Sequence, residues 1–195
     1  AQMATLPRMK PRCFYDLVVE VAIIRPGPIV GRKVHPYLRR RAGREPVRYP
    51  HPSLEPILRR TLGVPLFQEQ AMRIAMECAG FTVGQAEELR RAMNHKRSVE
   101  RKEHQEKLLR TGLAARGITG QAADGIVESL GSFFGLYGFP ESHAASFALL
   151  VYASAYLKAH HPAAFLCARL AEWGGFHHPA VYMAEATRLG LRVRP

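Results

Sequence analysis

The chain has 195 residues, with 28 lysines and arginines against 16 acidic residues and a formal net charge of +12. This imbalance favours a polyanionic partner, and 47% hydrophobic residues are enough for a folded core. No apolar run reaches the ~20 residues of a membrane-spanning helix. Cys13, Cys78 and Cys167 lie far apart among apolar neighbours. We expect these cysteines to be small core residues of a protein in a reducing compartment, and we expect neither a disulfide framework nor a zinc site.

The N-terminal third combines a helical pattern with a basic block. Apolar residues recur at helical spacing over 12–24, and a proline- and glycine-rich turn at 25–28 ends that element. Residues 31–60 hold nine basic residues and two acidic ones, nine minus two or +7. We expect this block to contact nucleic-acid phosphates or to form a solvated face. Ser53 is the predicted N-cap of a helix that ends at Gly63.

The middle of the chain predicts a series of helices with clear start and stop signals. One helix spans about 67–79, and the next begins with a capping box formed by Thr82 and Gln85. A third helix runs over 98–115, and a shorter one follows Thr119.

The C-terminal third contains the most apolar helix. Residues 131–143 are rich in glycine and aromatics and predict a structured loop, which either approaches a ligand or packs into the core. Ser142 is the predicted N-cap of a helix over 144–157, apolar on nearly every face and expected to be central. Two helices that start at prolines follow, over 162–173 and 179–190, and the alternating C-terminal tail is a predicted strand. The expected fold is mostly α, with at most a short strand or two near the ends.

The acidic residues exclude several kinds of active site. The two aspartates, Asp16 and Asp124, are more than a hundred positions apart. Two-metal phosphoryl transfer needs clustered carboxylates that hold cations ~4 Å apart. The chain also has no Gly-Lys dipeptide of a P-loop, no His-Glu-x-x-His motif and no nucleophile elbow. We therefore expect no catalytic residue and no metal ligand in this chain.

Two adjacent arginines are the strongest candidates for a binding site. Arg90 and Arg91 lie in one predicted helix, and each guanidinium group offers a fork of donors that fits phosphate oxygens. A solvated helix surface is the alternative that the pattern leaves open. Lys96 follows shortly after and raises the local positive potential. Gln68 and Gln70 begin an earlier helix, where they are candidate ligands or local caps.

Five short motifs in this order resemble a known family. They are Phe14-Tyr15-Asp16-Leu17-Val18, Arg25-Pro26-Gly27-Pro28, Phe67-Gln68-Glu69-Gln70, Leu89-Arg90-Arg91-Ala92-Met93 and Tyr137-Gly138-Phe139-Pro140-Glu141-Ser142-His143-Ala144-Ala145. The series resembles the bacterial C-family DNA polymerases, represented by the alpha subunit of DNA polymerase III, over essentially the whole chain. The segment is similar to the fingers domain of that family with the flanking edge of the palm.

The resemblance implies a domain organisation and a set of partners. Residues 1–30 would be a palm-edge segment, 31–173 the helical fingers domain, and 174–195 a helix and strand that lead to the next domain. The parent enzyme would be a DNA-directed DNA polymerase, a nucleotidyltransferase that uses Mg²⁺ in its palm, so this fragment alone would be inactive. Expected partners are primer–template DNA, deoxynucleoside triphosphate (dNTP), the sliding clamp and other replication or repair subunits. The expected location is the bacterial cytoplasm at the nucleoid, and a membrane is not an expected partner.

The resemblance also implies roles for individual residues. In that family the arginine pair contacts the triphosphate of the incoming nucleotide. Residues expected at the nucleotide are Arg90, Arg91, Lys96, Ser142, His143, Gln68 and Gln70. The basic block adds expected DNA contacts at Arg39, Arg40, Arg41 and Arg44, with Arg25 on the neighbouring turn as a further candidate.

Two departures from the replicative pattern indicate a subtype. Pro140-Glu141 stands where replicative subunits usually carry Asn-Lys, and Asn94-His95-Lys96-Arg97 where they usually read Gly-Lys-Lys-Lys. Both are more like the error-prone, damage-associated type of alpha subunit. A replicative alpha subunit is the alternative within the family. The alternative of another class is a non-catalytic adapter module that binds nucleic acid.

Overall fold

The computed structural model describes residues 2–23, 36–94, 99–135, 139–173, 175 and 177–193. In this part of the chain every regular element is a helix, and a single bridge joins Phe67 to Phe139. The mostly α fold is therefore confirmed. The predicted strand in the C-terminal tail is wrong for residues 191–193, which have no regular structure, because alternation alone does not supply the neighbour that a strand needs.

The chain divides into two compact units, residues 1–145 and 146–195. The first unit contains α1 (Gln2–Met9), α2 (Phe14–Ile23), α3 (Pro36–Arg41), η1 (Pro52–Leu54), α4 (Glu55–Leu58), η2 (Arg59–Thr61), α5 (Gln68–Ala79), α6 (Val83–Asn94), α7 (Val99–Ala115) and α8 (Gly120–Gly135). Helix α9 (Glu141–His160) crosses the division, and the second unit adds α10 (Pro162–Ala171) and α11 (Pro179–Arg188). The functional boundaries predicted at 30/31 and 173/174 stay predictions.

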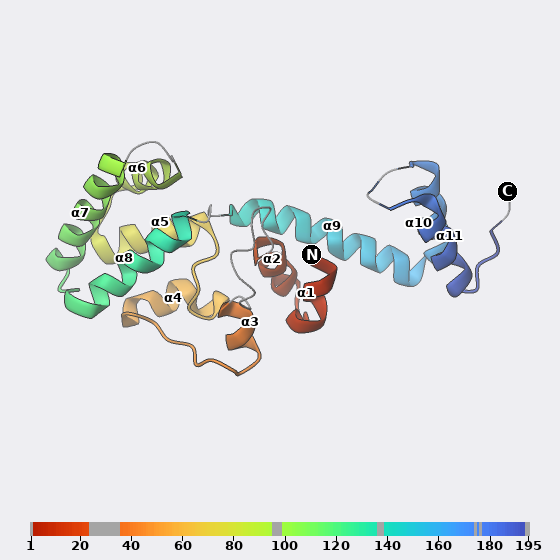
Figure 1. Cartoon of the computed structure of the whole chain (residues 1–195), viewed down its shortest axis with the longest axis horizontal. Coiled ribbons are helices and arrows are strands. Elements are labelled where there is room, and N and C mark those ends of the chain that lie inside the picture. The colour runs from red at the N-terminus through yellow and green to blue at the C-terminus, as the bar shows by residue number, and fades with distance from the viewer. Residues whose placement is uncertain are drawn as a thin grey trace. The chain divides into compact units, whose positions relative to one another are not determined.

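Helices α4 to α8 enclose the main core of the first unit (Figure 1). Each contributes an almost completely buried side chain: Leu58, Ile74, Leu89, Leu109 and Ile126. Burial of one such side chain stabilises the fold by about 1.5–3 kcal/mol. Because Leu89 faces this core, it fixes the rotation of α6 about its axis and with it the directions of the next two side chains.

Two glycines allow α5 to end and to pack closely. Gly80 adopts the left-handed conformation (φ 72°), and its N–H donates to the carbonyl of Met76; a side chain is disfavoured at this backbone conformation. Gly112 of α7 lies against the backbone of Ala79, where an added Cβ would clash with the carbonyl oxygen. Gly112 therefore sets the close approach of α5 and α7.

The predicted start of α6 is confirmed. The N–H of Gln85 donates to Thr82 Oγ1 (3.3 Å), and the N–H of Thr82 donates to Gln85 Oε1 (2.9 Å). These reciprocal bonds are the predicted capping box. The Ser53 prediction is wrong, because the N–H of Ser53 donates to His51 Nδ1 and His51 holds the cap position.

The predicted loop over 131–143 is wrong in its first part. Helix α8 continues to Gly135, since glycine costs only about 1 kcal/mol inside a helix that is already formed. Helix α9 begins at Glu141, and the N–H of Ala144 donates to the carbonyl of Pro140 (3.1 Å). Pro140 therefore holds the cap position, and Ser142 lies within the first turn instead of capping it.

Two predictions of burial are also wrong. Cys78 is buried, and burial raises the pKa of its thiol, but Cys13 and Cys167 are exposed. In α9 only Ala144 and Ala148 are buried, whereas Leu149 and Leu150 are 60% and 62% exposed. An apolar pattern identifies a helix that favours burial, but it does not identify the segment that covers it.

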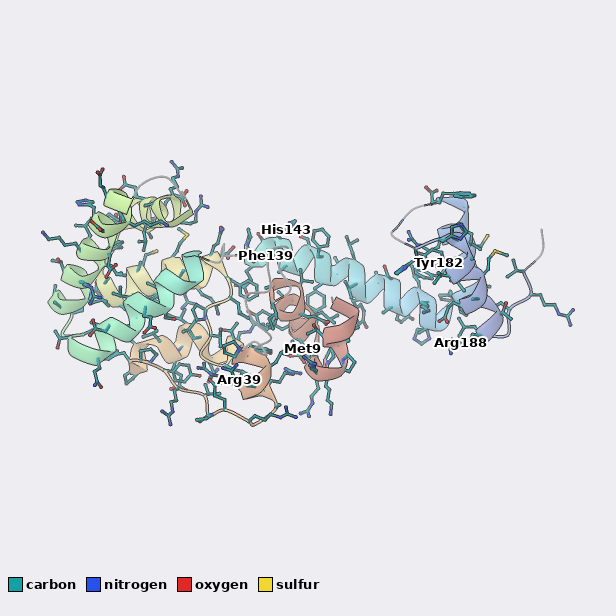
Figure 2. The ribbon with its side chains drawn as sticks, viewed as in Figure 1. Met9, Arg39, Phe139, His143, Tyr182 and Arg188 are labelled. Carbon is teal, nitrogen blue, oxygen red and sulfur yellow. The ribbon has the colours of Figure 1, made fainter. Side chains whose placement is uncertain are left out.

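The second unit joins the end of α9 to α10 and α11. Lys158 of α9 pairs with Glu185 of α11 (2.7 Å), and Arg169 of α10 donates to the hydroxyl of Tyr182 (2.8 Å), which Figure 2 labels. Among the described helices, none combines the length and the apolar character required to cross a membrane.

Candidate functional site

Arg90 and Arg91 converge on one carboxylate, that of Glu87. Arg90 donates from Nε to Glu87 Oε2 and from Nη2 to Oε1, both at 2.7 Å, and Arg91 donates from Nε to Oε1 at 2.9 Å. Glu87 precedes the arginines by three and four positions, the spacing at which helical side chains meet. The Arg91 side chain is 72% exposed and that of Arg90 is 28% exposed. The two guanidinium groups can therefore bind one anion together at the surface of α6.

The local electrostatics keep Glu87 ionised. The hydrogen bonds from Arg90, and then those from Arg91, lower the pKa of this carboxyl to about 2. The two arginines and Glu87 together carry a formal charge of +1, which the adjacent Glu88 cancels on this turn of α6. An incoming anion therefore meets an arginine pair that already binds a carboxylate.

Several other predicted residues lie where α5 and α9 begin. The N–H of Gln68 donates to the carbonyl of Phe139 (3.0 Å), next to the bridge between Phe67 and Phe139. The rings of Phe139 and His143 lie 5.1 Å apart at the start of α9 (Figure 2). Ser142 is exposed on the same turn. The structure thus gathers Gln68, Ser142 and His143 at one junction.

Carboxylates hold this junction together. The N–H of Glu141 donates to both carboxylate oxygens of Glu69, at 2.9 and 3.1 Å. Tyr15 of α2 donates its hydroxyl to Glu141 Oε1 at 2.7 Å, and the guanidinium group of Arg60 lies 3.6 Å from the centre of the Tyr15 ring. Burial, followed by the bond to Glu141, raises the pKa of Tyr15. The sequence did not predict these roles, although Tyr15, Glu69 and Glu141 stand in three of the five ordered motifs.

Gln70 uses its side chain inside the fold. Its Oε1 accepts from the N–H groups of Leu66 (2.9 Å) and Phe67 (3.2 Å), and its Nε2 donates to Thr61 Oγ1 (2.9 Å). The residue is 5% exposed. This geometry supports the alternative of a local cap, and contact with a nucleotide stays a prediction without support from these bonds.

Arg41 of the basic block binds groups on α1 and α2. It donates from Nη1 and Nη2 to the two oxygens of Asp16, both at 2.7 Å, and from Nε and Nη2 to the carbonyls of Met9 and Lys10. Burial disfavours the ionised form of Asp16, but bonds from Arg41 and from the N–H groups of Arg12 and Cys13 outweigh it and lower the pKa. Arg41 therefore ties three helices together.

The other predicted DNA contacts of this block have local partners or lie at the surface. Arg39 and Arg40 donate from Nε to the two oxygens of Glu45, at 2.7 and 2.9 Å. Arg44 is exposed on the turn after α3. Arg25 and Lys96 lie outside the described residues.

Comparison with known proteins gives the family. Residues 1–117, more than half of the chain, match the bacterial DNA polymerase III alpha subunit finger domain. The chain belongs to this family. The predicted resemblance to C-family DNA polymerases is thereby confirmed.

The chain also has similar relatives over its whole length. It is 60% identical over 195 residues to the error-prone DNA polymerase of Anaeromyxobacter dehalogenans (strain 2CP-C), covering 100% of this chain and 17% of the relative. It is 59% identical over 196 residues to the error-prone DNA polymerase of Nocardia farcinica (strain IFM 10152), covering 99% and 17%. The error-prone DNA polymerase of Mycobacterium tuberculosis (strain ATCC 25618 / H37Rv) is 57% identical, covering 99% and 18%. The chain thus spans less than a fifth of the length of these relatives, and the error-prone likeness is confirmed.

The chain offers no metal centre among its described residues. No three His, Cys, Asp or Glu side chains of that part are grouped as metal ligands would be. Asp16 binds Arg41, and Asp124 binds Arg110 (2.6 Å). A shallow hollow of about 360 Å³ lies on α7 beside Glu106 and Arg110, and none of the predicted site residues lines it.

Proposed function

We propose that this finger domain binds the incoming dNTP for an error-prone, damage-associated DNA polymerase, with Arg90 and Arg91 on the triphosphate. The observation that carries the proposal is the convergence of both guanidinium groups on the Glu87 carboxylate at the surface of α6. Groups that bind one carboxylate together can bind a phosphate in the same way, because both anions accept forked hydrogen bonds. Positioning and charge neutralisation are most of what phosphoryl transfer requires from a protein.

The junction between α5 and α9 would border the nucleotide at its base or sugar. Phe139 and His143 supply aromatic surface, and Ser142 and Gln68 supply polar groups. Base stacking on aromatic rings tolerates every base, which suits a polymerase that accepts four nucleotides. Lys96 would add to the positive field of the arginine pair. We assign Gln70 to the support of α5 because its bonds are internal.

Primer–template DNA would contact arginines of the basic block. Arg44 lies at the surface, and Arg39 and Arg40 share the single carboxylate of Glu45, although the Arg40 side chain is only 16% exposed and also donates to the carbonyl of Leu62. Contacts of this kind bind backbone phosphates and position a duplex without reading its sequence. Arg25 remains a further candidate. We assign Arg41 a structural role because Asp16 and two backbone carbonyls occupy its donors.

The complete polymerase would catalyse DNA-directed nucleotidyl transfer. Its Mg²⁺ would supply charge neutralisation at the reacting phosphates. The described residues of this chain do not fit such a metal, because Asp16 and Asp124 each bind an arginine. We therefore assign Mg²⁺ to other segments of the polypeptide. The sliding clamp and other replication or repair subunits would bind outside this chain, and the enzyme would work in the bacterial cytoplasm at the nucleoid.

The test is nucleotide kinetics of the complete polymerase with single substitutions. We expect Arg90→Ala and Arg91→Ala each to raise KM for dNTP by about tenfold or more, since a hydrogen bond to a charged group contributes about 1.5–3 kcal/mol. Arg73→Ala is the matched control, because Arg73 pairs with Glu77 at the same i, i+4 spacing on α5. Equal KM values for the wild type and both α6 variants would refute the proposal.

A further inference from the structure

Glu87 occupies three of the donors that a phosphate could use. It accepts from Nε and Nη2 of Arg90, which form one edge of that guanidinium group, and from Nε of Arg91. A bidentate phosphate contact uses such an edge. Because a carboxylate and a phosphate cannot both make the forked contact with this edge, a phosphate that binds the Nε–Nη2 edge of Arg90 displaces Glu87 from it.

We propose that Glu87 is the resident counter-anion of the arginine pair, and that the nucleotide triphosphate exchanges with it on binding. The inference rests on the proposed function and deepens it by naming a residue that weakens nucleotide binding. The same exchange works in reverse: when Glu87 returns to the arginines, it assists the release of the pyrophosphate that nucleotidyl transfer produces. Glu87 thus acts as an internal competitor that sets the affinity of this site for polyphosphates.

The surroundings of Glu87 suit exchange better than permanent pairing. Its side chain is 31% exposed, so the carboxylate can rotate into solvent without leaving a buried site. Its partners lie on the same helix, and ion pairs of this local kind are weak in water. The pKa of the carboxyl, lowered to about 2, keeps it ionised at any working pH. A competitor of this strength weakens binding without preventing it.

An orienting role for Glu87 makes the opposite prediction. If the carboxylate served to hold the two guanidinium groups ready for the nucleotide, removing its charge would loosen them and weaken nucleotide binding. If the ion pairs were only a surface feature of α6, removing the charge would act through the general field alone. Glu88 measures that field effect, because it is exposed on the same helix and has no ion pair among the described residues.

The experiment compares Glu87→Gln with Glu88→Gln in the complete polymerase. Both substitutions remove one negative charge from α6. We expect Glu87→Gln to lower KM for dNTP by about two- to fivefold. The inhibition constant of pyrophosphate should fall as well. Glu88→Gln should change both constants less. The difference should shrink as salt is raised, since salt screens exposed charges.

Each result decides the inference. A KM for Glu87→Gln that is equal to that of Glu88→Gln, or above that of the wild type, overturns the counter-anion role. The Arg90→Ala variant separates this failure from that of the proposed function. If Arg90→Ala raises KM and Glu87→Gln does not lower it, only the inference falls. If Arg90→Ala and Arg91→Ala both leave KM unchanged, the proposed function falls and the inference with it.

Discussion

Helices α3 and α6 both carry adjacent arginines, but they use them differently. Arg41 of α3 binds Asp16 and the carbonyls of Met9 and Lys10, all on elements distant in sequence. Arg91 of α6 binds a carboxylate four positions away on its own helix. The Arg41 side chain is 19% exposed, against 72% for Arg91. The location of the partner, rather than the charge itself, separates an arginine that holds the fold from one that is available to a ligand.

The energetics follow from this difference. Removing one member of a partly buried pair leaves the other charged in a poorly solvated place, which costs far more than the loss of a surface pair. Asp16 is 7% exposed, so it cannot turn into water when Arg41 is lost. Glu87 is 31% exposed at its side chain and can. The comparison therefore predicts large effects on stability at α3 and small ones at α6.

The largest expected effect is the loss of stability caused by Arg41→Ala, which tests whether α3 and α6 differ as described. We expect this substitution to lower the free energy of unfolding of the 195-residue chain by about 2–4 kcal/mol, because it leaves Asp16 without its charged partner and frees two backbone carbonyls. Urea-induced unfolding followed by circular dichroism measures this change. Arg91→Ala is the matched control and should stay within about 0.5 kcal/mol of the wild type. Equal losses from the two substitutions would contradict the comparison.

The second prediction concerns the pH dependence of stability, where the expected effect is smaller. The folded pKa of Asp16 is lowered, so its ionisation stabilises the folded state above the ordinary value of 3.8, and this contribution is lost as pH falls through the folded pKa. Protonation keeps the side chain in place, so the loss should be smaller than that from Arg41→Ala. The melting temperatures of the wild type and Asp16→Asn should differ at pH 7 and converge below pH 3.8. A constant difference across this range would show that Asp16 contributes through packing, not through its charge.

Local signals in the sequence were enough for much of the fold. The Thr82 and Gln85 capping box, Gly80 as the end of α5, and the prolines at the starts of α10 and α11 all act within one helical turn. Such signals can be read without knowing which helices meet. Burial could not be read in the same way. Apolar residues surround α9, yet Leu149 and Leu150 are exposed, because covering them requires a partner that periodicity does not specify.

The residues of the candidate site differ in the same way: those within one motif could be predicted from the sequence, and those brought together by folding could not. The arginine pair was identifiable because it lies in one motif, and its bond to Glu87 follows from helical spacing. The junction of Tyr15, Glu69 and Glu141 was not, since its members are up to 126 positions apart and meet only in the folded chain. For the same reason Arg41 looked like its neighbours in the basic block. Its bonds to Asp16 span 25 positions.

The smallest expected effect concerns Arg44, the exposed arginine that follows α3. The comparison indicates that an arginine at the surface is available to phosphates, so Arg44→Ala should weaken DNA binding by the complete polymerase and leave stability unchanged within about 0.5 kcal/mol. Loss of one phosphate contact reduces the steepness of the decline of log affinity with log salt by about 0.7–0.9, equally for DNA of any sequence.

The matched control for Arg44→Ala is Arg73→Ala, which removes the same charge from α5, outside the basic block. Fluorescence anisotropy with a labelled primer–template at several salt concentrations gives both slopes. A less steep slope for Arg44→Ala alone places phosphate binding on the turn after α3. Equal slopes for the wild type and both variants would mean that exposure does not make an arginine a DNA contact, and that the basic block is a solvated face.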